Sequence, residues 1–591
     1  MLIHKMRLDD YKAVLDVNSG AVHLVDDLIY DLLDVFDGEN GEEAISAMKD
    51  RYDEAELREA VEELTELKNE GLLFSPEFEV PPTFSETPVL KSLCLHIAHD
   101  CNLRCGYCFA GTGDFGGCRA LMSKEVAEKA VEFAITGSKK RHNLELDLFG
   151  GEPLMNWPVV EHVINYVRRR EQETGKNIKL TLTTNGTLLN DENIKFLNDN
   201  RVMLVLSLDG KKETHDRMRP FPNHTGSYDA AVRGFKKVIE SRHGKNYYLR
   251  GTYTHYNPYF CEDTLDMTKI GKEISVEPVV GTDEPYVLTE EDLPVLYEEY
   301  DKLARAYLQK RHEGDPFDFF HFNVALDNGP CVAKRLAGCG AGHEYFAITP
   351  EGDIYPCHQF VGDPAYKLGN VWDGVTNTAL RDEFKLCNVY ARPDCKDCWA
   401  RLYCAGGCAA NALHATGDIH GTYEYGCKVF RKRMECALMM QVAQRLDGGA
   451  LCDQRLSRLG KLALIAVMKL LVGRIAGILA LDLQLLLVAE MLIDIAVQKL
   501  GGGHDLLPPH PLGTGIHQVI DGVEQLLVLR IDQTVSCHQI TGQLIFHCHS
   551  SISPQNYDRS DLVLAPGEGF PFMLRPSARE GASQKTRLIF L

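Results

Sequence analysis

The chain has 591 residues, with 84 acidic and 63 basic side chains, and therefore carries a formal net charge of −21 at pH 7. Its length predicts several domains, and the acidic excess disfavours nucleic acid as a partner. Nineteen cysteines without a recognisable signal peptide predict a reducing, cytoplasmic compartment, where disulfides are rare.

Residues 1–80 predict a small winged-helix-like module. A DNA-binding wing is one alternative, but the stretch is acidic and has no Lys/Arg-rich helix. The module resembles the peptide-recognition element of ribosomal-peptide modifying enzymes, which implies that a leader peptide adds as a strand to an exposed hairpin edge. Residues 81–90 form the expected extended linker. The expected strands are 11–17 and 21–25, and the expected helices are 26–36, 42–52 and 54–70.

Residues 91–325 alternate strands with helices, which predicts an α/β fold with a parallel sheet. Ligands of such sheets bind beyond the carboxyl ends of the strands. Ser123 is the expected N-cap of the first helix. The expected strands are 93–99, 145–149, 179–184, 203–207, 247–253 and 275–280, and the helices between them include 159–170, 191–198 and 228–241.

A loop with the spacing CxxxCxxC follows the first of these strands. It contains Cys101, Cys105 and Cys108, and Phe109 comes next. Three thiolates can hold three irons of a [4Fe-4S] cluster and leave the fourth iron open to a chelating ligand. A structural zinc site would want four ligands in CxxC pairs, so the spacing favours iron.

These residues, with the Gly-Gly-Glu-Pro turn about forty residues later, resemble the radical S-adenosylmethionine (SAM) superfamily. The resemblance implies a partial (βα)6 barrel in which SAM chelates the open iron and is cleaved to a 5′-deoxyadenosyl radical. It also implies contacts from Phe109 to the adenine and from the turn to the methionine amino group. The SAM-binding residues so expected are Phe109, Gly150, Gly151, Glu152, Pro153, Asn185, Ser207 and Arg219.

A second set of cysteines occupies residues 326–447. A zinc ribbon of Cys395, Cys398, Cys404 and Cys408 is one interpretation. The fuller pattern, CX12GX4C, then CX2CX5CX3C, then C, resembles the SPASM extension of radical SAM enzymes and implies two auxiliary [4Fe-4S] clusters, three in all. The implied distal ligands are Cys395, Cys398, Cys404 and Cys427, and the proximal ligands are Cys339, Cys357 and Cys408, with either Cys331 or a substrate thiolate in fourth place.

Shorter runs such as Tyr355-Pro-Cys-His-Gln-Phe360 and Leu368-Gly-Asn-Val-Trp372 look like the SCIFF-peptide maturases. That resemblance implies a thioether between a Cys sulfur and a carbon in a short Cys-rich peptide, with a flavodoxin or ferredoxin as electron donor. In the related sulfatase maturases an Asp follows the cysteine equivalent to Cys357; here it is His358, which argues against formylglycine formation. Another SPASM oxidation, such as carbon–carbon crosslinking or sulfatase maturation, and a non-catalytic peptide carrier remain alternatives.

Residues 448–591 differ from the rest of the chain. Residues 451–591 hold twelve basic and twelve acidic side chains, so the whole acidic excess lies before them. The apolar stretch 462–497 is broken by five charges, whereas a membrane span wants about 20 residues nearly free of charge. We expect a fused or misjoined tail without a role in the enzyme, and no membrane partner.

Overall fold

The computed structural model describes residues 2–77, 89–281, 284–326, 336 and 338–446, and the backbone of 588–590. Contacts divide the chain into two compact units, residues 1–450 with 585–591, and residues 451–584. Outside the described residues lie the second unit, most of the linker at 81–90 and Cys331. In the described part, no helix has the length and apolar character needed to cross a membrane.

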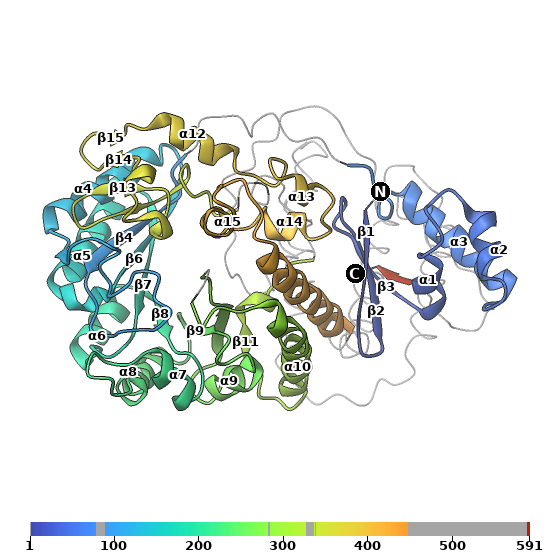
Figure 1. Ribbon diagram of the computed structural model, residues 1–591, viewed down its shortest axis with the longest axis horizontal. Coiled ribbons are helices and arrows are strands. Elements are labelled where there is room, and N and C mark those ends of the chain that lie inside the picture. The colour runs from blue at the N-terminus through green and yellow to red at the C-terminus, as the bar shows by residue number, and fades with distance from the viewer. Residues whose placement is uncertain are drawn as a thin grey trace, which may run out of the picture. The chain divides into compact units, whose positions relative to one another are not determined.

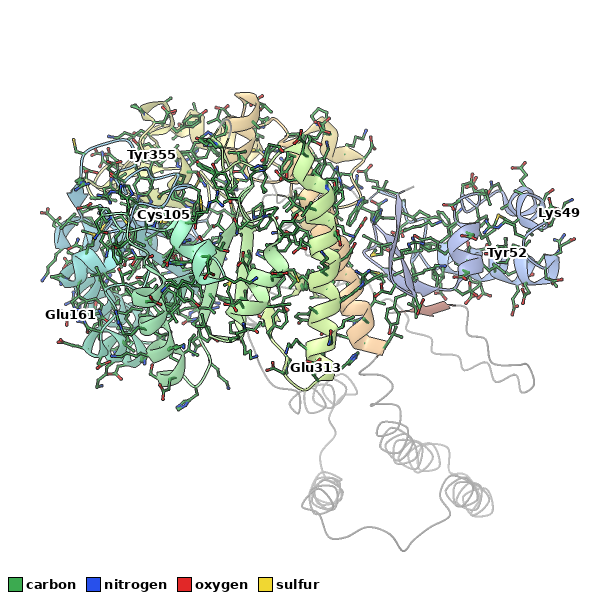
Figure 2. The ribbon with its side chains drawn as sticks, turned by 60° about the horizontal axis from the view of Figure 1, so that its bottom comes forward. Lys49, Tyr52, Cys105, Glu161, Glu313 and Tyr355 are labelled. Atoms are coloured by element: carbon green, nitrogen blue, oxygen red, sulfur yellow. The ribbon has the colours of Figure 1, made fainter. Side chains whose placement is uncertain are left out.

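The N-terminal module combines a small antiparallel sheet with three helices (Figure 1). Its helices pack through one apolar face each, with Leu28, Ile29, Leu57 and Leu64 in a shared core, and Tyr52, marked in Figure 2, donates from its hydroxyl to a carboxylate on the first helix. The elements are β1 (Ile3–Leu8), β2 (Tyr11–Asp16), β3 (Val22–Val25), α1 (Asp27–Leu32), α2 (Gly41–Met48) and α3 (Glu54–Asn69).

The first strand was not expected from the sequence. β1 pairs with β2 from Ile3↔Asp16 to Leu8↔Tyr11, but only its last residues alternate clearly between buried and exposed positions. At the opposite edge, β16 (Leu588–Phe590) pairs antiparallel with β3, so the sheet order is β1-β2-β3-β16. An edge of this sheet can therefore take an added strand.

The six expected strands of the barrel are confirmed, and they are parallel neighbours in chain order. The strands are β4 (Ser92–His99), β6 (Asn143–Gly150), β7 (Asn177–Thr184), β8 (Met203–Ser207), β9 (Tyr247–Tyr253) and β10 (Glu273–Pro278), with the short β5 (Ala120–Leu121) and β11 (Asp318–Phe319) beside them. The helices are α4 (Lys124–Gly137), α5 (Trp157–Thr174), α6 (Asp191–Asp199), α7 (Lys212–Met218), α8 (Tyr228–Ser241), α9 (Phe260–Met267) and α10 (Leu293–His312).

Local sequence explains these elements. The Ser123 hydroxyl accepts a hydrogen bond from the Val126 amide at 3.1 Å, so the expected N-cap of α4 is confirmed. Along β6, Leu144, Leu146 and Leu148 are buried in the core that the helices cover. Since successive side chains of a strand point to opposite faces, the intervening residues line the inside of the curved sheet.

The Cys-rich region continues the same sheet. β12 (Tyr345–Ile348) pairs parallel with β4, from Tyr345↔Ser92 to Ile348↔Leu95, and further strands and short helices follow. These are β13 (Asp353–Tyr355), β14 (Gly369–Asn370), β15 (Gly374–Val375), α12 (Thr378–Leu386), α13 (Pro393–Lys396), α14 (Arg401–Cys404) and α15 (Ala409–Thr416), followed by a helix over 424–446. The pairing fixes this region beside the strand that leads into the CxxxCxxC loop.

Candidate functional site

The three cysteines of the CxxxCxxC loop follow β4 at the carboxyl end of the sheet. Burial raises the pKa of Cys101 to about 11 and that of Cys105 to about 12, and the charge of Cys108 acts on both. The Leu103 amide and the Asn185 side chain lie 3.4 Å and 3.9 Å from the Cys101 sulfur. Buried thiols that act on one another need positive charge to ionise, which bound iron would supply.

The turn after β6 packs against this loop without room for side chains. A Cβ on Gly150 would lie 2.3 Å from the Ala98 carbonyl oxygen, and one on Gly151 would lie 2.2 Å from the Asp100 carbonyl oxygen. The amides of Gly151 and Glu152 donate to those same two oxygens at 2.8 Å and 2.9 Å. The turn therefore holds the backbone that enters the CxxxCxxC loop.

Glu152 connects this turn to the end of β7. Its buried carboxylate accepts hydrogen bonds from the Thr184 hydroxyl and the Asn185 amide at 2.8 Å, and from the Leu154 amide at 3.1 Å. Burial raises its pKa to about 7. The Asn185 side chain in turn donates to the Asn102 side chain at 2.9 Å. The expected SAM-binding residues from Gly150 to Pro153 and Asn185 are thus brought to the cysteine loop.

Arg219 is bound to a buried carboxylate instead of facing open space. Its Nε lies 3.0 Å from Asp209 Oδ2, and the two side chains are 12% and 0% exposed. The Tyr107 hydroxyl donates to the same oxygen at 2.5 Å. Burial raises the pKa of Cys105 and Cys108, and the Arg219 charge acts in the opposite direction on both. Its contact to SAM stays a prediction.

Phe109 lies next to both the CxxxCxxC loop and His358, the residue after the auxiliary cysteine Cys357. It is 48% exposed, and its ring stacks on Phe149, at the end of β6, with centroids 6.5 Å apart. The His358 ring lies 5.3 Å from each of these two aromatic rings. Ser207 is half-buried at the end of β8, in register with Arg250 of β9. Since His358 follows Cys357, the loop that would hold SAM adjoins the auxiliary cysteines.

The described auxiliary cysteines separate into two groups of mutually interacting thiols. The groups match the two implied ligand sets, although the ligand assignment itself stays a prediction. The first group is Cys339, Cys357 and Cys408, and the second is Cys395, Cys398, Cys404 and Cys427.

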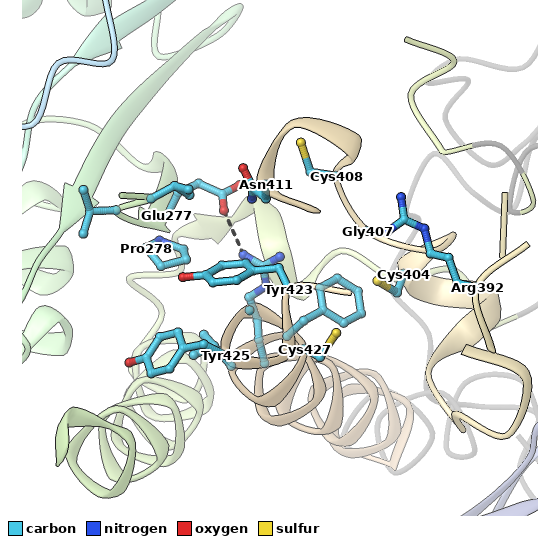
Figure 3. Close-up of a pocket in the computed structure, with 16 residues that line it drawn as sticks. Glu277, Pro278, Arg392, Cys404, Gly407, Cys408, Asn411, Tyr423, Tyr425 and Cys427 are labelled. Carbon is cyan, nitrogen blue, oxygen red and sulfur yellow. Dashed lines mark hydrogen bonds and ion pairs between the residues drawn. The ribbon is translucent and has the colours of Figure 1, made fainter. Parts of the chain in front are cut away.

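A cavity of ≈ 210 Å³ lies between the end of β10 and these thiols (Figure 3). Cys408 of the first group and Cys404 and Cys427 of the second line it. On the barrel side, Glu277 Oε2 lies 3.1 Å from Arg433 Nη1, the pair that Figure 3 joins by a dashed line. Burial opposes ionisation of Glu277, but neighbouring positive charge lowers its pKa below the usual value. The cavity wall is therefore charged on one side and sulfur-lined on the other.

Two residues beside these thiols, the half-buried Cys387 and the buried Arg392, were missed by the sequence reasoning. The Cys387 sulfur accepts a hydrogen bond from Arg392 Nη2 at 3.0 Å and donates to the Ile419 carbonyl at 3.1 Å. Burial raises the pKa of Cys387, and the charge of Cys339 acts in the same direction. Cys387 falls outside the motif spacing, so its only signal was one more cysteine between Cys357 and Cys395.

The cysteine arrangement fits cubane clusters. Thiolates are the ligands that iron–sulfur clusters take in proteins, and both regions supply them from several cysteines. In the described residues, no three His, Cys, Asp or Glu side chains gather closely enough to hold one metal ion.

Comparisons with known proteins agree with this site. Residues 95–255 match the radical SAM superfamily, and residues 339–399 match the SPASM iron–sulfur cluster-binding domain. The chain is 26% identical over 349 residues to the cysteine-type anaerobic sulfatase-maturating enzyme of Clostridium novyi, covering 54% of this chain and 89% of that protein. It is 22% identical over 341 residues to the antilisterial bacteriocin subtilosin biosynthesis protein AlbA of Bacillus subtilis, covering 56% of this chain and 70% of that protein.

Among solved structures, native anSMEcpe with bound AdoMet and Cp18Cys peptide matches with a TM-score of 0.51 and 22% identity. The match covers 60% of this chain and 99% of that one, and it supports the fold alone. The chain therefore carries a region that matches the radical SAM superfamily and a region that matches the SPASM domain in one polypeptide, and it is similar to the anaerobic sulfatase-maturating enzymes.

Proposed function

We propose that this enzyme installs thioether crosslinks, from Cys sulfur to carbon, in a short Cys-rich ribosomal peptide. Its cofactors would be SAM and three [4Fe-4S] clusters, and its partners the precursor peptide and a flavodoxin- or ferredoxin-type electron donor in the cytoplasm. When bound, these cofactors supply a 5′-deoxyadenosyl radical that removes a hydrogen atom and metal centres that accept an electron. The relatives that modify proteins or peptides support a peptide substrate.

The observation that carries the proposal is the contact of Phe109 and Phe149 with His358. These rings connect the end of the CxxxCxxC loop with the residue after Cys357, at 5.3 Å from ring to ring. A radical made beside Phe109 would therefore arise next to the proposed proximal cluster.

The reaction balances if the two halves of the site divide the work. Joining a thiol to a C–H carbon releases one hydrogen atom from the carbon, and one proton and one electron from the sulfur side. The hydrogen atom would leave at the SAM end of the site, and the cluster that Cys339, Cys357 and Cys408 would hold would supply the acceptor for the electron. The protein's contribution is to hold sulfur and carbon within bonding reach of each other.

The N-terminal module would bind the leader. Residues 588–590 already pair antiparallel with β3, which supports the ability of this edge to accept an extended segment through backbone hydrogen bonds. An acidic module favours a leader that carries basic residues. Leader binding would raise the local concentration of the peptide's cysteines at the barrel.

The test is product analysis. The reconstituted enzyme is incubated with SAM, dithionite and a Cys-rich precursor peptide, and the product is examined by mass spectrometry after alkylation of free thiols. A thioether predicts loss of two hydrogens and one alkylatable thiol for each bond formed. Loss of two hydrogens with all thiols alkylated would indicate carbon–carbon crosslinking, and no release of 5′-deoxyadenosine would indicate a carrier.

Sulfatase maturation is the second candidate, because a sulfatase-maturating relative aligns over 89% of its own length. His358 stands where those enzymes carry an Asp, and burial together with the Arg250 charge lowers its pKa to about 4. An aldehyde formed in a sulfatase-derived peptide, detected with a hydrazine probe, would support this candidate against the first.

A further inference from the structure

The buried arginine of the Cys-rich region, Arg392, has one N–H without a partner. The residue is 2% exposed, and its Nε has no hydrogen-bond acceptor among the described residues. Leaving a buried donor unpaired costs free energy, and the cost is larger for a charged group. Since buried donors in proteins are nearly always paired, a ligand acceptor is expected at this position.

The other nitrogens of Arg392 fix the guanidinium in place. Nη1 donates to the Gly421 carbonyl, and Nη2 donates to the Ile419 carbonyl at 2.7 Å and to the Cys387 sulfur at 3.0 Å. These bonds hold the plane of the group, so the direction of its Nε–H is set by the protein. Arg392 therefore offers one unpaired N–H donor, at Nε, and one positive charge, both in a fixed position.

A glycine lies beside this Nε. A Cβ on Gly406 would lie 3.5 Å from Arg392 Nε. Gly406 and Gly407 have φ angles of +84° and +78°, a conformation that favours glycine, and they separate Cys404 from Cys408, which belong to different thiol groups. Arg392 lines the cavity of Figure 3 together with both cysteines.

The charge of Arg392 reaches both thiol groups. Arg392 lies three residues before Cys395, and it lines the cavity of Figure 3 with Cys408 of the first group and Cys427 of the second. A positive charge and N–H donors near cluster sulfurs stabilise the more negative, reduced state of an iron–sulfur cluster and raise its reduction potential.

We propose that Arg392 is a positioning residue that donates its Nε–H to a sulfur of the auxiliary clusters and, through its charge, raises the reduction potentials of both. This inference rests on the two auxiliary clusters of the proposed function. Higher reduction potentials would make the two auxiliary clusters better acceptors of the electron released when the peptide is crosslinked. The reduction potentials of the clusters can be measured without substrate.

The experiment uses the full chain with Cys101→Ala, Cys105→Ala and Cys108→Ala, in which about eight irons should remain because each cubane holds four. Potentials are measured by redox titration followed by electron paramagnetic resonance. Arg392→Gln should lower both potentials, with at least a tenfold fall in the ratio of reduced to oxidised cluster at fixed solution potential, about 59 mV for one electron. Arg392→Lys keeps the charge and lacks the Nε–H, so its shift should be smaller.

Arg401→Gln is the matched control. Arg401 is also buried and its Nε also lacks a partner among the described residues, but its other nitrogens bind the Lys396 carbonyl and the Asn18 side chain. Unlike Arg392, it is not among the residues that line the cavity of Figure 3. This variant should keep both potentials.

Unchanged potentials in an Arg392→Gln chain that keeps its iron would overturn the inference. If that variant loses iron, Arg392→Lys decides: a lowered potential supports the proposal and an unchanged one overturns it. An equal shift in Arg401→Gln would also overturn it, since any buried cation would then suffice. A parent chain without auxiliary iron would refute both this inference and the cluster assignment, whereas unchanged potentials refute only the role of Arg392.

Discussion

Replacing Gly151 by Ala is the most direct perturbation of the SAM site. The added Cβ would lie 2.2 Å from the Asp100 carbonyl oxygen and 3.2 Å from the Cys101 Cβ. Ordinary van der Waals contact begins at about 3.4 Å, so the backbone that enters the cysteine loop must move by about 1 Å. The obstacle is a main-chain atom, which cannot turn aside as a flexible side chain would.

A displacement of that size matters because iron–sulfur bonds tolerate little change. Metal-ligand distances in functional sites stay within about 0.2 Å of their ideal values. We therefore expect Gly151→Ala to lose the SAM-binding cluster, that is, about four irons per chain, and to release no 5′-deoxyadenosine. Iron analysis, the visible absorption of the reconstituted protein and chromatography of the SAM products measure these effects.

Gly117→Ala provides the matched control in the same loop. Its Cβ would lie 3.5 Å from the nearest atom, the Asp114 carbonyl oxygen, which is ordinary contact. This variant should keep its iron and cleave SAM. Full iron and normal SAM cleavage in Gly151→Ala would refute the argument that the turn fixes the loop.

Four further predictions follow from the remaining parts of the chain. Cys101→Ala, Cys105→Ala and Cys108→Ala should each abolish SAM cleavage while leaving about eight irons, and 5′-deoxyadenosine from the triple variant would contradict the site. Removing residues 1–80 should sharply weaken precursor binding in a calorimetric titration but spare peptide-independent SAM cleavage; equal affinity would count against the leader module. Truncation after Asp447 should leave iron and crosslinking intact and should retain or tighten leader binding, because residues 588–590 no longer pair with β3; lost crosslinking would make the tail part of the enzyme. Burial and the Glu145 charge raise the pKa of Asp147 from 3.8 to about 6, so the free energy of unfolding of the metal-free protein should fall by about 2 kcal/mol between pH 4 and 6. Thermal unfolding of the metal-free Asp147→Asn variant should lack this fall.

Much of the barrel could be predicted because its signals are local. β8, β9 and α8 have the bounds expected from hydrophobic periodicity, and the Ser123 cap follows from residue type alone. The two groups of auxiliary cysteines match the sets that the resemblance to the SPASM extension implied. β1 was missed because its alternation between buried and exposed side chains is weak.

The parts that could not be predicted depend on contacts between distant segments. Nothing in the sequence around Tyr345 indicates that β12 would pair with β4, more than two hundred residues earlier. Cys387 and Arg392 likewise gain their significance only from folding, which brings them beside Ile419 and the thiol groups. A motif describes residues along the chain, whereas these two act through neighbours that the motif does not contain.

The pairing of β12 with β4 has a consequence for the chemistry. Parallel strands in one sheet have a fixed register, so the ends of β4 and of the β12–β13 hairpin cannot shift separately. The CxxxCxxC loop follows the first, and Cys357 and His358 follow the second. A shared sheet therefore sets the separation between the proposed radical source and the proposed electron acceptor. Radical coupling demands such a fixed distance, because a carbon radical held out of reach of its sulfur would react elsewhere.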